Sequence, residues 1–321
     1  MTRCLITGAN GFVGSNLMAR LVSEGNYSAR AVVREAHAAE RRFSDVGVIT
    51  DLGPDTEWTE VLQGVDVVVH CAARVHIMGA SGDRSEEMFD RVNVQGSLNL
   101  ATQAAAMGVQ RFIFISSIKV NGEQTHAGHP FAADDLPAPS DAYARSKLLA
   151  EKGLQRLALE TGMELVIIRP PLVYGPGVGA NFLTLMRWLQ KGLPLPLGSV
   201  DNARSLVAVF NLVDLIIRCI DHPCAKGEVF LVSDDDDMST TTLLVRLGEA
   251  LGEPARLIPF PVKLIAWGAT VLGRRSMAQR LCDSLQVDIQ KTKRLLKWAP
   301  PCTVQDALNE TAKYLIEQRA S

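Results

Sequence analysis

The sequence predicts an α/β protein in which a doubly wound parallel sheet carries a smaller C-terminal lobe. Two observations indicate this fold class. Short β-branched segments alternate with longer amphipathic segments, as in consecutive βαβ units. The short segments are also almost continuously apolar, which is typical of parallel strands that helices cover on both faces.

Six segments of the first half have the composition of strands. In chain order they are CLITG from Cys4, SARAVVR from Ser28, VGVITD from Val46, VDVVVH from Val65, RFIFISS from Arg111 and ELVIIRP from Glu164. After Pro170 the chain becomes rich in Gly and Pro, and GEVFLVSD near residue 230 is one more strand candidate. We predict a sheet domain over residues 1–170, completed by about 206–235, and a smaller lobe from 171–205 and 236–321.

Composition and charge exclude several classes of partner. With 47% hydrophobic residues, 21% charged residues and a net charge of -2, a nucleic-acid surface is not expected. The apolar segment VKLIAWGATVLG stops at Arg274 and is too short to cross a bilayer, so it predicts a core helix or a wall of the smaller lobe, and no membrane insertion. The N-terminus lacks the pattern of an export signal, which favours a cytoplasmic location. Neither the six cysteines nor the six histidines show a metal-ligand spacing, so no metal is predicted.

A glycine-rich turn joins the first strand to the first helix. Gly8, Gly11 and Gly14 stand in LITGANGFVGSNLMARL. Glycines at these positions permit a tight turn and let backbone N–H groups approach a pyrophosphate at the positive end of a helix. This arrangement predicts a dinucleotide-binding Rossmann fold.

The ends of the second and third strands bear on the choice of dinucleotide. Where an NAD-binding protein usually offers an acid to the adenosine ribose, this chain has Val33 and Arg34. Arg34 can pair with a 2′-phosphate, which favours NADP(H) over NAD(H), although an exposed strand-end arginine would look the same. Asp51 can accept a hydrogen bond from the adenine amino group, or can cap a helix.

A tyrosine and a lysine lie four residues apart in DAYARSKLLAE. At this spacing Tyr143 and Lys147 share one face of a helix. A nearby ammonium favours the phenolate, so Lys147 is expected to lower the pKa of Tyr143 and make it a useful acid/base. Ser116 and Ser117 end the fifth strand, at the carboxyl edge where ligands bind open α/β sheets.

Together these motifs resemble the extended short-chain dehydrogenase/reductase family of sugar-nucleotide epimerases, dehydratases and reductases. The matching stretches are TGxxGxxG with Gly8, Gly11 and Gly14, HCAA at 70–73, NVQGSLNL from Asn93, SS followed by VNG, Tyr143 with Lys147, RPPLVYGPG, and LQVD with LKWAPP. The resemblance implies that Tyr143 is the acid/base and that Lys147 tunes it and binds the cofactor ribose. It further implies that Ser117, with Ser116 as the alternative, binds the substrate oxygen, and that Asn93 is a support inside its helix. Phe12 and Ala72 are placed beside the cofactor.

The resemblance also implies a sugar-nucleotide site on the smaller lobe. Asn181 and Phe182 match the family's contacts to the nucleotide, with a plain helix cap as the alternative for Asn181. Arg204 and Arg280 resemble the arginines that hold the diphosphate, a task that suits guanidinium groups. Arg74, Val75 and His76 follow the fourth strand and can border the nicotinamide or the sugar, although His76 is expected to be a loop residue and not a catalyst.

Departures from the family pattern narrow the predicted reaction. Dehydratases of the family carry an Asp-Glu pair where this chain has Ile118 and Lys119. The family often has a tyrosine after the fifth strand where this chain has Asn121. Together with Arg34, this departure favours an NADPH-dependent reductase. The predicted reaction is reduction of the C4 ketone of a UDP-4-keto-6-deoxy-N-acetylhexosamine in bacterial surface polysaccharide (O-antigen) synthesis. The alternatives are a UDP-sugar 4-epimerase with tightly bound NAD and a non-catalytic NADP-binding sensor. The resemblance also predicts a homodimer through the helix from Ala142 and the helix containing Asn93.

Overall fold

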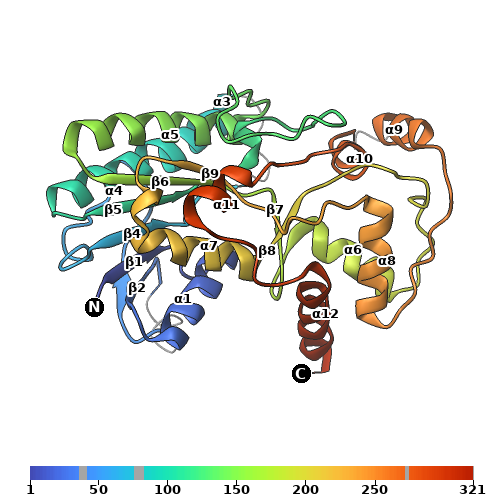
Figure 1. The fold of residues 1–321 in the computed structure, drawn as a ribbon, viewed down its shortest axis with the longest axis horizontal. Coiled ribbons are helices and arrows are strands. Elements are labelled where there is room, and N and C mark those ends of the chain that lie inside the picture. Colours follow the sequence, from blue (N-terminus) through green and yellow to red (C-terminus); the bar gives the residue numbers. More distant parts are fainter. Residues whose placement is uncertain (36–41, 76–82, 272–274, 321) are drawn as a thin grey trace.

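A seven-stranded parallel sheet forms the centre of the larger lobe in the computed structural model, which describes residues 1–35, 42–75, 83–271 and 275–320 (Figure 1). The strand order is β3-β2-β1-β4-β5-β6-β9, and every neighbouring pair is parallel. The strands are β1 (Arg3–Thr7), β2 (Ser28–Val33), β3 (Val46–Val48), β4 (Val67–His70), β5 (Arg111–Ile115), β6 (Glu164–Arg169) and β9 (Val229–Leu231). Each predicted strand segment contributes one of them, and the doubly wound α/β fold is confirmed.

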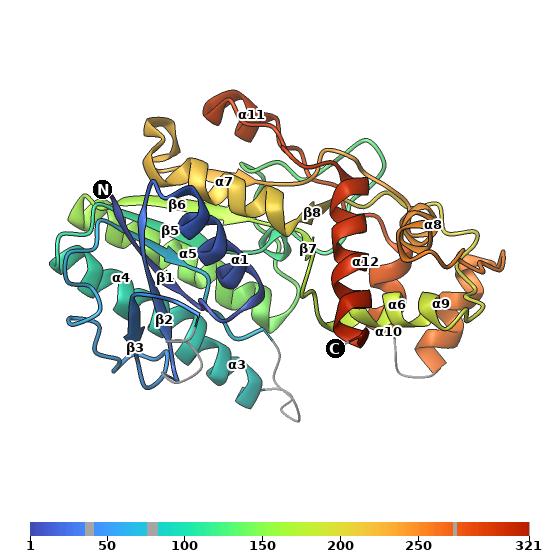
Figure 2. The same cartoon turned by 90° about the horizontal axis from the view of Figure 1, so that it is seen from below.

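Helices cover both faces of this sheet (Figure 2). The helices of the larger lobe are α1 (Phe12–Glu24), α3 (Asp83–Phe89), the π-helical η1 (Asp90–Gln95), α4 (Gly96–Ala106), the short 3₁₀ turns η2 (Ile118–Val120) and η3 (Pro223–Ala225), α5 (Ala142–Thr161), α7 (Val209–Asp221) and α11 (Gln290–Leu296). α1 packs with α7 on one face, and α4 packs with α5 on the other. Every residue of the central strands β4 and β5 is buried, which explains their continuous apolar sequence.

The smaller lobe is built on a separate pair of short parallel strands. β7 (Leu172–Tyr174) pairs with β8 (Leu206–Ala208), and its helices are α6 (Ala180–Gln190), α8 (Thr240–Leu251), α9 (Val262–Val271), α10 (Arg275–Cys282) and α12 (Val304–Ala320). Leu244, Leu247 and Leu308 lie in its core, where α8 packs against α6 and α12. The chain returns to the main sheet with β9, and α11 packs against that strand, so the two lobes are interleaved in sequence.

The apolar segment VKLIAWGATVLG predicts either a core helix or a wall of the smaller lobe. Helix α9, which lies in this segment, is not a core helix. Val262 and Ile265 pack against the core of the smaller lobe, whereas Leu264 and Trp267 face outward with exposed fractions of 51% and 69%. Spacings of three residues keep each pair on one side of the helix, so α9 has two apolar faces and only one of them is covered. None of the helices within the described residues has the length and apolar character needed to span a membrane.

Helix α5, which carries the tyrosine–lysine pair, has well-defined ends. The carboxylate of Asp141 accepts a hydrogen bond from the Ala144 backbone nitrogen at 2.7 Å and so caps the first turn. Gly162 ends the helix with a φ of 78°, a left-handed conformation that glycine adopts without strain. Asp141, one residue before Ala142 and two before Tyr143, therefore fixes where α5 begins.

Candidate active site

The turn after β1 can be built only from glycine at two positions. Gly8 has a φ of 66°, and a Cβ on it would lie 2.9 Å from the Ala72 backbone nitrogen. A Cβ on Gly14 would lie 2.2 Å from the Gly8 oxygen. Gly11 is the N-cap of α1 and has no side chain to cover the helix end, so the backbone amides there remain available to a ligand. This cradle fits the pyrophosphate of a dinucleotide.

A buried histidine, His70, lies beside the glycine turn and helps to position the backbone there. One His70 ring nitrogen lies 2.7 Å from Thr7 Oγ1 and the other lies 2.9 Å from Ser97 Oγ. Burial, together with the nearby Lys147 ammonium, lowers the pKa of His70 to about 3, so the ring is neutral. Thr7 Oγ1 also accepts from the backbone nitrogen of Ala72 at 3.1 Å. His70 therefore positions the backbone at Ala72, one of the predicted cofactor residues.

The predicted adenosine contacts lie at the ends of β2 and β3. Arg34 directly follows β2 and is exposed. Asp51 accepts a hydrogen bond from Thr56 Oγ1 at 2.9 Å, and its other oxygen lies 3.8 Å from a nitrogen of Arg91. The predicted roles of Arg34 in binding a 2′-phosphate and of Asp51 in binding adenine stay predictions.

Tyr143 and Lys147 lie on consecutive turns of α5, as their spacing predicts. The half-buried Tyr143 ring meets Phe89 edge-on, with ring centroids 6.0 Å apart. The buried Lys147 Nζ donates to the Ile115 carbonyl oxygen at 2.8 Å and lies 4.4 Å from the centroid of the Phe114 ring. The ammonium is thus fixed at the carboxyl end of β5, close to where the two serines follow.

The direction of the Tyr143 pKa shift differs from the sequence-based expectation. Burial, with a smaller contribution from the Asp141 carboxylate, raises the pKa of Tyr143 to about 12 instead of lowering it. The pKa of Lys147 is lowered to about 8 because the ammonium is buried, although Glu151 and the Cys71 thiol work in the opposite direction. The expectation was wrong because it considered only the helical spacing and not the burial of both groups.

The structure separates the roles open to the two serines after β5. Ser116 is buried, and its hydroxyl donates to a carboxylate oxygen of Glu151 at 2.5 Å. Ser117 is half-buried, and its hydroxyl accepts from the Lys119 backbone nitrogen at 3.3 Å, which leaves its own proton free to be donated. The geometry therefore favours Ser117 over Ser116 as the group that meets a substrate oxygen.

A buried ion pair behind these serines was not predicted from the sequence. The guanidinium of Arg169 donates to both carboxylate oxygens of Glu151, at 3.0 and 2.6 Å, and to Oδ1 of Asn121 at 2.9 Å. Asn121 in turn donates to the Ala132 carbonyl oxygen at 2.9 Å. The signal that could have revealed it is the position of Glu151, four residues after Lys147 on the same helix face.

Asn93 holds the loop after β4 against α5. Its amide oxygen accepts from the Arg74 backbone nitrogen at 2.8 Å, and its amide nitrogen donates to the Arg74 carbonyl at 3.0 Å and to Ser146 Oγ at 3.0 Å. Asn93 lies in the π-helical turn η1, and π-helical turns are frequent at functional sites. The Arg74 Nε is buried without a hydrogen-bond partner, which suits a residue that meets a ligand. His76 lies outside the described residues.

The two arginines predicted to hold a diphosphate lie near each other. Arg280 on α10 is exposed. The pKa of Arg204 is lowered mainly because this guanidinium is buried, and the positive charge of Arg280 lowers it further. The pKa of Asp141 at the start of α5 is lowered, against the effect of burial, mainly by its hydrogen bonds to Lys119 and the Ala144 backbone, and the Arg280 charge adds to this. Arg204 is anchored through a hydrogen bond to the Asp283 carbonyl oxygen at 2.7 Å. Two guanidinium groups held near one another and near α5 form a site suited to an anion.

The predicted nucleotide contacts on α6 have different environments. Asn181 is exposed in the first turn, where the N-cap is Gly179, so the alternative of Asn181 as the cap is wrong. The Phe182 ring is only 2% exposed and stacks on Tyr174 with centroids 5.6 Å apart. The Phe182 side chain is therefore a packing residue of the smaller lobe and does not offer its ring to a ligand.

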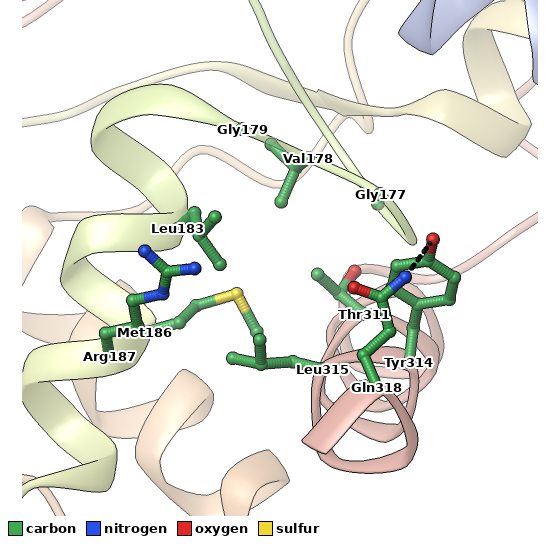
Figure 3. A pocket seen from close by; sticks show the side chains of 11 residues that line it. Gly177, Val178, Gly179, Leu183, Met186, Arg187, Thr311, Tyr314, Leu315 and Gln318 are labelled. Carbon is green, nitrogen blue, oxygen red and sulfur yellow. Dashed lines mark hydrogen bonds between the residues drawn. The ribbon is translucent and has the colours of Figure 1, made fainter. Parts of the chain in front are cut away.

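A cavity of about 220 Å³ lies between α6, α12 and the loop after β7 (Figure 3). Arg187 of α6 and Gln318 of α12 line it, and Gln318 donates to the Tyr314 hydroxyl at 2.7 Å. None of the predicted site residues lines this cavity. The candidate active site is instead the edge of the sheet that Gly8, Tyr143 and Lys147 border.

Comparisons with known proteins show what the chain is similar to. The chain is similar to UDP-glucose 4-epimerase of Vibrio cholerae, with 46% identity over 98% of this chain and 95% of that protein. It is also similar to N-acetyl-alpha-D-glucosaminyl-diphospho-ditrans,octacis-undecaprenol 4-epimerase of Escherichia coli O157:H7, with 25% identity over 97% of this chain and 94% of that protein.

Solved structures of similar proteins share the fold. UDP-glucuronic acid 4-epimerase from Bacillus cereus, in complex with NAD, superposes with a TM-score of 0.79 at 19% identity and covers 99% of each chain. At this identity the likeness concerns the fold. The model of the NAD dependent epimerase/dehydratase family matches residues 4–233. The chain therefore belongs to the NAD dependent epimerase/dehydratase family.

Proposed function

We propose that this protein interconverts a UDP-hexose and its 4-epimer with a tightly held NAD. The observation that carries the proposal is the 46% identity to a UDP-glucose 4-epimerase over 98% of the chain. It favours the epimerase, the alternative in the sequence analysis, over the ketone reductase that the sequence alone favoured. A non-catalytic sensor is disfavoured because Ser117, Tyr143 and Lys147 are all present at the sheet edge.

The side chains at the sheet edge suit proton transfer at C4 of a sugar. When bound, the nicotinamide supplies a reversible acceptor for the hydride at that carbon. Tyr143, as its phenolate, would take the proton of the C4 hydroxyl, and the resulting phenol would later return that proton to the C4 oxygen. Lys147 stays fixed by the Ile115 carbonyl, and the Ser117 hydroxyl donates to the C4 oxygen.

The substrate end of the site rests on the arginines of the smaller lobe. Arg204 and Arg280 would hold the diphosphate, since paired guanidinium groups bind phosphate oxygens strongly. Epimerisation requires the planar keto sugar to present its second face before the hydride returns. Holding the molecule mainly by its diphosphate leaves the sugar ring free to make that turn.

Turnover of nucleotide sugars without added cofactor tests this proposal. We expect purified protein to convert UDP-glucose or UDP-N-acetylglucosamine into the 4-epimer, which anion-exchange chromatography resolves, and to release NAD on denaturation. The Tyr143→Phe variant should lose about 10²–10⁴-fold in kcat. A matched control is Tyr27→Phe, which removes a hydroxyl that donates to Asp221 away from the site and should keep wild-type turnover. Absence of any epimer from the wild-type protein would contradict the proposal.

The second candidate function is the NADPH-dependent reduction of a UDP-4-keto-6-deoxy-N-acetylhexosamine. Arg34 favours it, because an exposed guanidinium at the end of β2 suits a 2′-phosphate. The expected result for this candidate is stoichiometric loss of NADPH absorbance with the keto sugar and no 4-epimer from UDP-glucose.

The helix α5 and the helix that contains Asn93 are together the candidate dimer face. Light scattering after size exclusion would test the predicted homodimer.

A further inference from the structure

Four large apolar side chains are exposed within one short segment at the outer end of the smaller lobe. They are Ile258 (48% exposed), Phe260 (39%), Leu264 (51%) and Trp267 (69%). We call this set the α9 patch. In both views α9 lies at the end of the molecule away from the main sheet (Figures 1 and 2). Single exposed apolar residues are ordinary, but four within residues 258–267, two of them aromatic, indicate a binding surface.

The patch is a consequence of how α9 packs. Val262 and Ile265 turn toward the core of the smaller lobe and hold the helix there. Leu264 and Trp267, three residues apart, therefore share the opposite face. Phe260 precedes the helix between two prolines, Pro259 and Pro261. A helix of 10 residues is too short to cross a bilayer but can lie flat on one.

The segment that carries the patch has basic residues and no acidic ones. Between Glu253 and Asp283 the sequence has no acidic residue, and its basic residues are Arg256, Lys263, Arg274, Arg275 and Arg280. This segment carries five positive charges in a chain whose net charge is -2. Lys263 lies next to Leu264 in α9 and is itself exposed. Exposed Trp, Phe and Leu combined with basic residues are typical of helices that bind anionic lipid surfaces.

We propose that the α9 patch docks this protein on an anionic phospholipid surface. Leu264, Trp267 and Phe260 enter the boundary between headgroups and acyl chains, while Lys263 and Arg256 lie against the lipid phosphates. A second copy of the chain is a poorer occupant, because a symmetric contact through this patch would bring the exposed Arg256 and Lys263 of both copies together. α9 packs against α10, which carries Arg280, so docking places the anion-binding side of the smaller lobe close to the membrane.

Flotation of the full-length protein with lipid vesicles tests the proposal. We expect binding to vesicles of phosphatidylcholine with phosphatidylglycerol, weaker binding to phosphatidylcholine alone, and a loss of binding when salt is added. The double variant Leu264→Ser, Trp267→Ser should bind anionic vesicles at least about tenfold more weakly. Lys263→Glu should weaken binding to anionic vesicles and leave binding to neutral vesicles unchanged.

The matched control is the double variant Val22→Ser, Leu136→Ser, which removes two apolar side chains that are 63% and 91% exposed elsewhere on the molecule. This control should bind like the wild type, and every variant should keep wild-type turnover of a soluble UDP-sugar. A blue shift of tryptophan fluorescence on vesicle addition that disappears in Trp267→Phe would support the proposal. Failure of the wild type to bind anionic vesicles, or an equal loss in the control variant, would overturn it. Either result leaves the proposed epimerase activity, measured without lipid, unaffected.

Discussion

Lys147 carries its charge in a buried position, and this predicts the alkaline limit of activity. Because burial lowers the pKa of Lys147 to about 8, the ammonium loses its proton as the pH rises through that value. We expect kcat to fall above about pH 8. In Lys147→Arg the guanidinium stays charged, so this alkaline limb should vanish even if the rate at neutral pH is lower. A kcat profile that falls at the same pH in both proteins would show that another group sets the limb.

The two serines after β5 should differ sharply when each is replaced. Ser117→Ala removes the hydroxyl available to the substrate oxygen, and we expect a loss of about 10²-fold in kcat. Ser116→Ala removes one hydrogen bond to Glu151, whose carboxylate keeps the two from Arg169, so we expect a smaller loss of kcat with reduced thermal stability. Steady-state rates and thermal melts of both variants separate the roles. The reverse order of the two rate losses would reassign the substrate contact to Ser116.

At the scale of elements, the junction of β1 with α1 depends on the absence of one methyl group. A Cβ on Gly14 would lie 2.2 Å from the Gly8 oxygen, so Gly14→Ala must displace the turn that is proposed to bind NAD. We expect the purified variant to lose most of its bound nicotinamide. Gly25→Ala at the other end of α1 is the matched control, because a Cβ there meets no atom within 4 Å. Its φ of 67° costs about 1–2 kcal/mol of stability in an L-residue but should not change nicotinamide content, measured after denaturation.

The Glu151–Arg169 ion pair joins α5 to β6 behind the catalytic edge. Replacing Glu151 by Gln leaves the buried Arg169 charge without a counter-charge, which costs about 3–5 kcal/mol of stability. It also removes the carboxylate that works to raise the pKa of Lys147, so the alkaline limb of kcat should move to lower pH.

A second ion pair between strands β5 and β6 provides the matched control. Arg111 and Glu164 meet at 2.5 Å near the amino ends of these strands, away from Lys147. Glu164→Gln should lower the melting temperature less, because the Glu164 side chain is 29% exposed, and should leave the pH profile unchanged. An identical shift of the pH profile in both variants would contradict a specific link between Glu151 and Lys147.

For the whole molecule, the local patterns that the sequence displays predict the parallel sheet of the larger lobe. Strands that are buried on both faces have continuous apolar sequences, and the glycine spacing marks the turn after β1. The sequence therefore predicts the strands and this turn. The proximity of Arg204 to Arg280 was available only through the family resemblance, since 75 residues separate the two arginines in the chain.

Features that depend on tertiary packing were missed or misjudged. The burial of Phe182 and the exposure of Trp267 arise from how α6 and α9 sit on the smaller lobe, and neither helix shows this in its own sequence. The raised pKa of Tyr143 has the same origin, because burial outweighs the effect that spacing alone suggested. The proposed reaction differs from the one that Arg34 favours, because a relative with 46% identity over 98% of the chain bears on the reaction more directly than one arginine at the end of β2.

The central claim is that one hydride leaves C4 of the sugar and returns to the same carbon. A UDP-hexose labelled with deuterium at C4 tests it most directly, with the product examined by NMR and mass spectrometry. We predict that the 4-epimer keeps its deuterium at C4 and that no added nicotinamide is consumed. Loss of the deuterium, or product formation only with stoichiometric oxidation of NADPH, would contradict an epimerase and favour the reductase.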